Sequence, residues 1–158
     1  MVDFVLPVGA DGEVQGHDHP DLDDSKRIIR RVSEDFIVPD GNGGSRISSA
    51  LFKLDPKGGY LSADSESCIL DRKMDPVAYV TTPKWIGSLV ITVGNFRSID
   101  KAAKAEDRWK IGMVPIKGND CHAGVWGKIT KGQSNDLQRL SDWLVQMRGV
   151  EKLEPAPS

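Results

Sequence analysis

The segment SLVITVGNFR, residues 88–97, decides the fold class that the sequence predicts. It is apolar and rich in β-branched residues, and it is short, so it favours a strand over a helix. Its apolar run is almost unbroken, which indicates a strand covered on both faces. We therefore expect residues 88–97 to form a central strand of a sheet.

Shorter apolar segments on both sides of this strand predict the rest of the sheet. In residues 109–116, WKIGMVPI, Trp109, Ile111 and Met113 alternate with other residues as in a half-buried strand. The spacing of apolar residues in 26–32 also fits a helical face, but their β-branched side chains favour a strand. The full set of expected strands is 2–8 at an edge, 26–32 continued by 36–38, 60–63, 77–81, 88–97, 109–116 and 122–129.

Leucine spacing near the C-terminus predicts a helix over residues 134–148. Leu137, Leu140, Leu144 and Val145 recur at i, i+3, i+7 and i+8, the pattern of a buried helical face. A second, short helix is expected over 47–54, where apolar residues recur at i, i+3, i+4 and i+7 after a possible Ser45 cap.

These elements predict an α+β protein with a mixed or mostly antiparallel sheet and a C-terminal helix packed on it. Its N-terminal third is rich in loops. We expect residues 1–25 to be a flexible segment, 26–152 a single domain and 153–158 a frayed tail.

Composition limits the classes of function. The formal net charge of −2 argues against broad electrostatic binding of nucleic acid, and the longest apolar stretch is too short to span a membrane. The N-terminus lacks the basic region of a secretory signal. Two cysteines are too few for a disulfide framework. We therefore expect reduced thiols in a cytoplasmic protein that does not bind membranes.

The first candidate site is the stretch GNGGSRISSALFKLDPKGGYLSAD, residues 41–64, which contains two clusters of glycine. It matches neither the phosphate-binding P-loop nor the dinucleotide-binding glycine motif. It is explained either by turn chemistry or as a ligand cleft. In the cleft, Arg46 would bind an anionic group, and Ser48 and Ser49 would supply hydroxyl donors.

Two clusters that contain histidine are further candidate sites. The segment HDHPDLDD, residues 17–24, has metal-ligand side chains but the composition of an acidic surface loop, so no metal is expected there. Residues 119–122, NDCH, are either a turn whose polar side chains cap the incoming strand, or a site where His122 faces a cleft shared with Arg46.

The order of three blocks, RRVSEDF, GGSRISSALFK and GGYLSADSES, resembles the layout of RES-domain and other ADP-ribosyltransferase-like folds, which use NAD. The resemblance implies that Arg30 or Arg31 takes the role of an early arginine in the NAD cleft. It also implies that Tyr60 and Ser62 correspond to the tyrosine and serine of the strand that lines the NAD cleft in those folds. Those folds carry a late acidic residue on a strand, and CHAGVWG, residues 121–127, has none.

The blocks RISSALFK, YLSAD, DPVAYVTTPKWIGSLVITVG and NDCHAGVWG also resemble a family of small uncharacterised bacterial proteins. Some proteins of this kind act in toxin or antiphage systems, which implies antiviral defence as a setting. Because no acid/base pair is evident, we expect a non-catalytic interaction or regulatory module without a cofactor that works with a larger protein partner. The alternative is an NAD- or nucleotide-handling enzyme.

Overall fold

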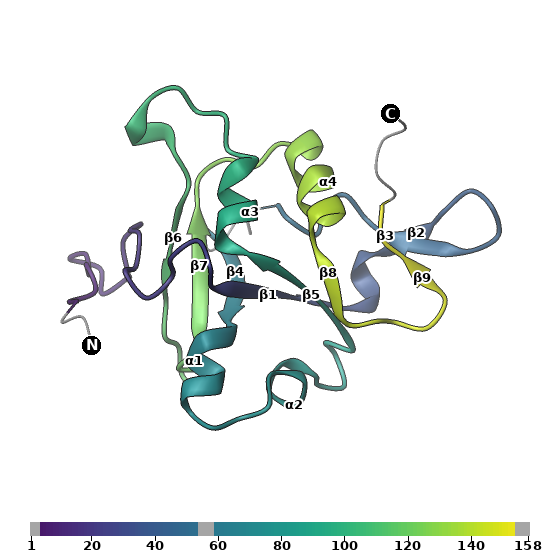
Figure 1. The fold of residues 1–158 in the computed structure, drawn as a ribbon, viewed down its shortest axis with the longest axis horizontal. Helices are drawn as coiled ribbons and strands as arrows, with labels where there is room; N and C mark the ends of the chain where they lie inside the picture. The colour runs from purple at the N-terminus through teal and green to yellow at the C-terminus, as the bar shows by residue number, and fades with distance from the viewer. Residues whose placement is uncertain (1–3, 54–58, 154–158) are drawn as a thin grey trace.

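The computed structural model describes residues 4–53 and 59–153, which form an α+β fold. The main sheet has six strands in the order β6-β7-β4-β1-β5-β8, all antiparallel, and a smaller sheet has the order β2-β3-β9 (Figure 1). The strands are β1 Arg27–Val32, β2 Ile37–Pro39, β3 Ser45–Ile47, β4 Leu61–Ser65, β5 Gly87–Thr92, β6 Lys110–Met113, β7 His122–Trp126, β8 Asp142–Val145 and β9 Val150–Glu151. The α-helices are α1 Glu66–Asp71, α2 Pro76–Val80, α3 Val93–Ser98 and α4 Lys131–Leu140, and short 3-10 turns cover Glu34–Phe36 and Ala105–Asp107. The predicted fold class is confirmed.

The segment 88–97 is a strand in its first half and a helix in its second. β5 lies between β1 and β8, as expected of an interior strand. At Thr92 the side chain accepts a hydrogen bond from the Asn95 amide at 3.0 Å, which caps α3. Val93 and Phe96 are then buried in the same core as Leu137 of α4. The prediction of a strand to residue 97 was wrong after Thr92 because a cap and two buried side chains favour the helix.

The C-terminal helix is present but shorter than predicted. α4 starts with a capping box formed by Thr130 and Gln133 and ends at Leu140. Leu137 is fully buried, whereas Leu140 is 40% exposed. Residues 142–145 instead pair with β5 as the edge strand β8. Leu144 and Val145 matched the helical spacing by coincidence, and pairing with β5 decides their structure.

Two further segments differ from the predictions. Residues 77–81 were expected to be a strand but belong mainly to α2, which the Asp75 side chain caps and which has Pro76 in its first turn. The helix expected over 47–54 is absent from its described part, where Ser45–Ile47 pairs with β2 and turns follow. The predicted edge strand over 2–8 forms one bridge, Val8 to Val14, within its described residues.

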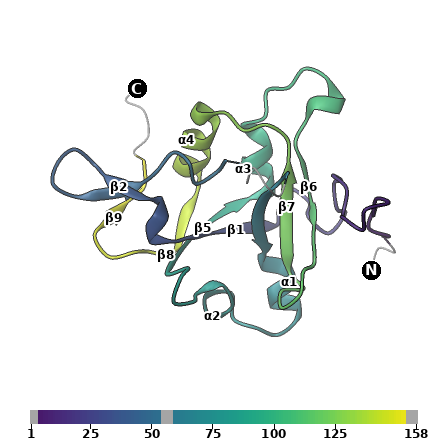
Figure 2. The same ribbon diagram turned by 180° about the vertical axis from the view of Figure 1, so that it is seen from behind.

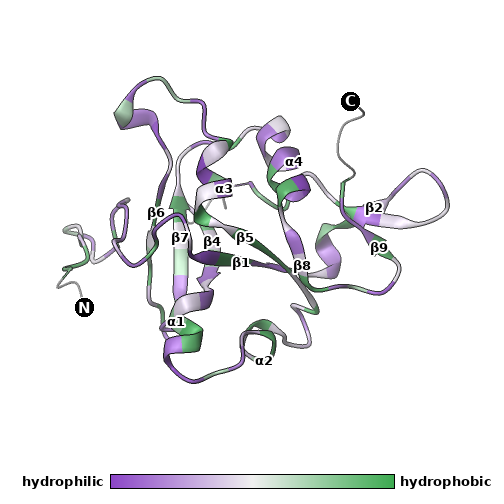
Figure 3. Cartoon of the chain, viewed as in Figure 1, coloured by the Kyte–Doolittle hydropathy of each residue, from purple (hydrophilic) through white to green (hydrophobic). Residues whose placement is uncertain are grey.

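Each face of the main sheet has its own apolar core. Ile28 and Ile29 are adjacent on β1 and therefore point to opposite faces. The larger core holds Ile28 with Phe96 of α3 and Leu137 of α4. The smaller core holds Ile29 with side chains of α1 and α2. Figure 2 shows the same arrangement from behind, and Figure 3 shows hydrophobic residues along β5 and in α1 and α2.

Cys68 of α1 and Cys121 form a disulfide, with their Cα atoms 5.5 Å apart. The prediction of reduced thiols was wrong. β4 pairs with β7, so α1, which follows β4, begins beside the start of β7. The two cysteines are far apart in sequence, and their meeting depends on this pairing. Disulfides are typical of oxidising compartments, so the cysteine content no longer supports a cytoplasmic location. In residues 4–53 and 59–153, no helix has both the length and the apolar character needed to cross a bilayer.

Candidate functional site

The candidate site lies where β1 and β4 stop pairing. β1 pairs with β5 over six residue pairs but with β4 over only two, Ile28 with Ser65 and Ile29 with Asp64. Beyond this point Arg30 spans the gap between the strands. Its Nε donates to the Leu51 carbonyl at 2.9 Å and its Nη1 donates to the Ser62 carbonyl at 3.2 Å. The Arg30 side chain thus donates the hydrogen bond that the Ser62 carbonyl cannot receive from β1, because the β1–β4 pairing ends at Ile29 and Asp64.

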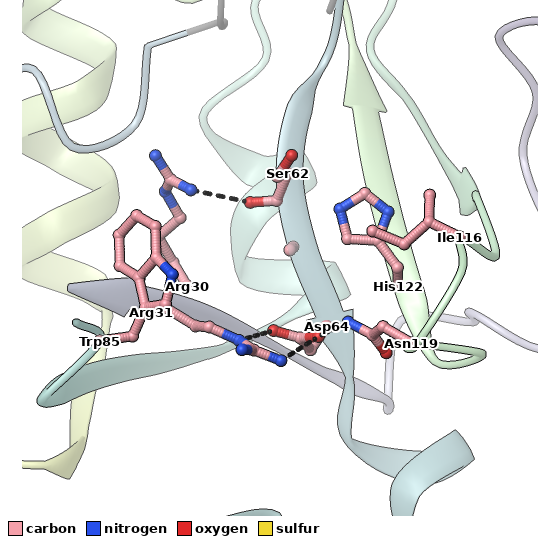
Figure 4. Close-up of a pocket in the computed structure, with 9 residues that line it drawn as sticks. Arg30, Arg31, Ser62, Asp64, Trp85, Ile116, Asn119 and His122 are labelled. Atoms are coloured by element: carbon pink, nitrogen blue, oxygen red, sulfur yellow. Dashed lines mark hydrogen bonds and ion pairs between the residues drawn. The ribbon is translucent and has the colours of Figure 1, made fainter. Parts of the chain in front are cut away.

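A cavity of about 220 Å³ opens at this split. Figure 4 shows Trp85 on one side of it, His122 and Ile116 on the other, Ser62 above and Asp64 below. The lining residues are Arg30, Arg31, Ser62, Ala63, Asp64, Trp85, Ile116, Asn119 and His122. They come from β1, β4, β7 and the loops before β5 and β7.

An ion pair between a half-buried arginine and a buried carboxylate forms the floor of the cavity. Arg31 donates from Nε and Nη2 to the two carboxylate oxygens of Asp64 at 2.8 and 3.1 Å. Asn119 donates from Nδ2 to the same carboxylate at 2.7 Å, and Asp64 is only 2% exposed. Such bidentate pairing and the extra donor offset the cost of burying the charge. The floor is therefore a fixed structure.

Asn119 is itself held by two donors. Its Oδ1 accepts from the Tyr79 hydroxyl at 2.5 Å and from the Cys121 amide at 3.1 Å. The amide group of Asn119 therefore links α2, the start of β7 and the Asp64 carboxylate.

His122 presents one ring nitrogen to the cavity. It lies opposite Asp64 in the β4–β7 register, so both side chains point to the same face of the sheet. Its Nδ1 is 2.8 Å from the Val114 carbonyl oxygen, which can only accept, so Nδ1 carries a proton. Nε2 is then the acceptor of the neutral ring, and Figure 4 shows the ring turned toward the cavity. The Tyr60 ring packs edge-on beside it, with centroids 5.9 Å apart.

The lining of the cavity has an excess of positive charge. Two guanidinium groups, those of Arg30 and Arg31, face it, against one carboxylate among the described lining residues. Arg30 also lies 5.4 Å from the centroid of the Phe36 ring. The site therefore suits a ligand that carries negative charge.

The structure brings together part of the predicted site. Arg31, Ser62 and His122 line the cavity, and Tyr60 packs against His122. Arg46 lies on β3 in the smaller sheet, where its Nη1 donates to the Ile47 carbonyl at 3.1 Å. It is not among the described residues that line the cavity with His122.

Ser48 and Ser49 hold α4 in place through their backbone. The Ser48 carbonyl accepts from Gln138 Nε2 at 2.7 Å, and the Ser49 carbonyl accepts from Ser134 Oγ at 2.5 Å. Their predicted role as hydroxyl donors to a ligand of this cavity is not supported by their position.

Sequence reasoning did not single out Asp64, Asn119 or Trp85 as site residues. Asp64 had a usable signal, because it lies two residues after Ser62 and shares its face once the strand predicted over 60–63 continues by one residue. Asn119 and Trp85 lie in loops, and their position depends on contacts between distant parts of the chain.

The segment 17–24 is fixed to β6. His17 Nε2 accepts from the Met113 amide at 3.3 Å, and its ring packs 5.2 Å from the Trp126 ring. Asp18 accepts from the Ile111 amide at 3.0 Å. Within the described residues no three histidine, cysteine or acidic side chains are grouped as a metal would require. The expectation that this segment binds no structural metal remains a prediction.

Comparison of the chain with family models, with curated proteins and with solved structures finds no match.

Proposed function

We propose that the protein is a binding module for a small anionic ligand, held in the cavity at the split between β1 and β4. The observation that supports this proposal is the convergence of Arg30, Arg31, Ser62 and His122 on one cavity from three strands. Arginine suits carboxylate and phosphate groups because its planar donors match their oxygens. His122 adds a second polar contact through Nε2.

The walls of the cavity favour a ligand with a flat apolar portion. Trp85 and Ile116 face each other across the site, and a flat group between them would stack on the indole (Figure 4). The anionic end would then lie toward Arg30 and His122. Pockets for drug-sized ligands measure roughly 300–1,000 Å³. A cavity of about 220 Å³ suits a smaller molecule, or one end of a larger one such as NAD.

The floor supports binding in preference to catalysis. Asp64 is the carboxylate of the cavity, and Arg31 and Asn119 already occupy both of its oxygens. The oxygens of Asp64 therefore already accept three hydrogen bonds from protein donors, which favours a structural role for this carboxylate. The strand His122–Trp126 offers no acidic side chain to replace it. We therefore keep an ADP-ribosyltransferase-like, NAD-handling enzyme as the alternative.

Exposed apolar side chains favour a role with a larger protein partner as the second part of the proposal. Leu70 on α1 is 51% exposed, Met74 in the following turn is 47% exposed, and Val77 on α2 is 40% exposed. Apolar side chains grouped on a surface are typical of interaction sites. The resemblance to small bacterial proteins supports a setting in a bacterial defence or toxin-linked system.

Titration calorimetry with a matched panel of ligands tests the proposal. Acetate, benzoate, inorganic phosphate, adenosine monophosphate and NAD separate the contributions of charge, flat apolar surface and size. We expect benzoate to bind more tightly than acetate, and Trp85→Ala to remove that difference.

Variants locate the binding. Arg30→Gln and His122→Asn should each weaken it at least about tenfold, as expected on losing a charged contact worth about 1.5–3 kcal/mol. His122→Asn keeps a donor near the Nδ1 position for the Val114 carbonyl but removes Nε2. Arg46→Gln is the matched control, because Arg46 lies in the smaller sheet. Failure of every ligand in the panel to bind at millimolar concentration would refute the proposal. Turnover of NAD would favour the alternative.

A further inference from the structure

The two sulfur atoms of the disulfide differ in their access to solvent. Cys121 is fully buried in the smaller core, beside Ile29 and Ile69. Cys68 lies on α1 and is partly exposed. In thiol–disulfide exchange, access decides which sulfur is attacked. An incoming thiolate can therefore reach Cys68 and not Cys121.

A second cavity, distinct from the ligand site, opens onto Cys68. Its volume is about 440 Å³. Its walls combine apolar side chains, such as Phe4 and Met113, with charged ones, such as Asp71 and Arg72. The cavity is large enough for a small thiol such as a cysteine-containing peptide. None of its residues lines the site at the split of the sheet.

We propose that Cys68 is a site of thiol–disulfide exchange, and that the exchange controls the floor of the ligand cavity. The reactant is a thiol reductant. Its thiolate attacks Sγ of Cys68, a bond forms between the two sulfurs, and the bond to Cys121 breaks. The electron pair leaves on Sγ of Cys121, which takes a proton from water. A second thiol then releases Cys68 as a thiol and leaves the reductant as its disulfide.

The link to the ligand cavity is a short chain of hydrogen bonds. The Cys121 amide donates to Oδ1 of Asn119 at 3.1 Å, and Nδ2 of Asn119 donates to Asp64 at 2.7 Å. The Cys121 carbonyl also accepts from the Ser65 amide at 2.9 Å, at the start of α1. Because Cys121 directly precedes His122, release of its sulfur removes a constraint next to both the floor and the wall of the cavity.

Trapping with glutathione tests the chemical step on the folded wild-type protein. The adduct should form on Cys68, as read by mass spectrometry of peptides. The single variants give a second measurement with Ellman's reagent. The free thiol of Cys121→Ser, which is Cys68, should react at least about tenfold faster than that of Cys68→Ser, since exposure controls thiol reactivity. An adduct mainly on Cys121, or no adduct until the protein unfolds, would overturn the proposal.

Nuclear magnetic resonance tests the link to the cavity without any ligand. On reduction by dithiothreitol, the signals of Asn119 and of the His122 ring should shift, while that of Arg46 Nε, in the smaller sheet, should not. Unchanged signals at Asn119 and His122 would overturn the coupling. The proposal that exchange at Cys68 alters the cavity depends on the proposed function only when ligand affinity is the property measured. If no ligand binds but these signals shift, the proposed function fails and the exchange site stands.

Discussion

Opening the bond between Cys68 and Cys121 should lower the free energy of unfolding by about 4 kcal/mol. The two residues are separated by 53 positions. For a loop of this length the chain-entropy relation gives about 14 cal/mol/K, which is about 4 kcal/mol at room temperature. Domains of this kind have total stabilities of about 5–15 kcal/mol, so the reduced protein should remain folded with a smaller margin.

Urea unfolding followed by tryptophan fluorescence measures this loss. The wild type with and without a non-thiol reductant gives the effect with every side chain in place. Cys68→Ala should unfold as the reduced wild type does, and reductant should not change it. This substitution leaves Cys121 in the core, where a free thiol packs as a small apolar group. A loss below about 1 kcal/mol, at an unchanged dependence on urea, would show that the loop-closure reasoning fails here.

Three further predictions concern the core, pH dependence and the N-terminal segment. Leu137→Ala should cost about 2–5 kcal/mol as a core truncation, whereas Leu140→Ala should cost well under about 1.5 kcal/mol because Leu140 is exposed; equal losses in urea unfolding would contradict the observed end of α4. Burial lowers the pKa of His19, so the unfolded chain binds the proton more readily and stability should fall as pH drops below the unfolded value of roughly 6.5. Melting temperatures of His19→Gln should therefore depend less on pH between about 7 and 5 than those of the wild type, and an identical slope would rule out this contribution. In Gly112→Ala the added Cβ would lie 2.5 Å from Nε2 of His17, so the N-terminal segment should detach from β6 and become sensitive to limited proteolysis. If the segment in Gly112→Ala resists the protease as well as it does in the wild type, β6 tolerates the added methyl group.

Local patterns predicted the elements whose structure local forces decide. The strand over 26–32 follows from its β-branched residues and is present as β1, and the strand predicted over 60–63 is present as β4. The pattern at Leu144 was misleading, because Leu144 and Val145 satisfy helical spacing but belong to β8, which pairs with the open edge of β5. No local window contains that edge, so no local pattern can indicate it.

The site was predictable only where neighbours in sequence share a face. Ser62 was named through the resemblance to NAD-using folds, and Asp64, two residues later on the same face, could have been named with it. His122 meets Asp64 because β4 and β7 pair in one register, across 58 positions of chain. A shift of this register by one residue would turn His122 to the opposite face. The same pairing brings Cys121 to Cys68, so the site and the disulfide were missed for one physical reason.

The short pairing of β1 with β4 has a consequence for how the molecule opens. It divides the main sheet into two three-stranded halves, β6-β7-β4 and β1-β5-β8, whose strands β1 and β4 are joined by two residue pairs, the Arg30 side chain and the ion pair of Arg31 with Asp64. Backbone amides at this boundary should exchange with solvent deuterium by local separation of the halves, at a lower free energy than the amides between β1 and β5. A ligand that touches Arg30 in one half and His122 in the other would join the halves. Its binding would then appear as slower deuterium uptake along the boundary between β1 and β4, far beyond the atoms that it contacts.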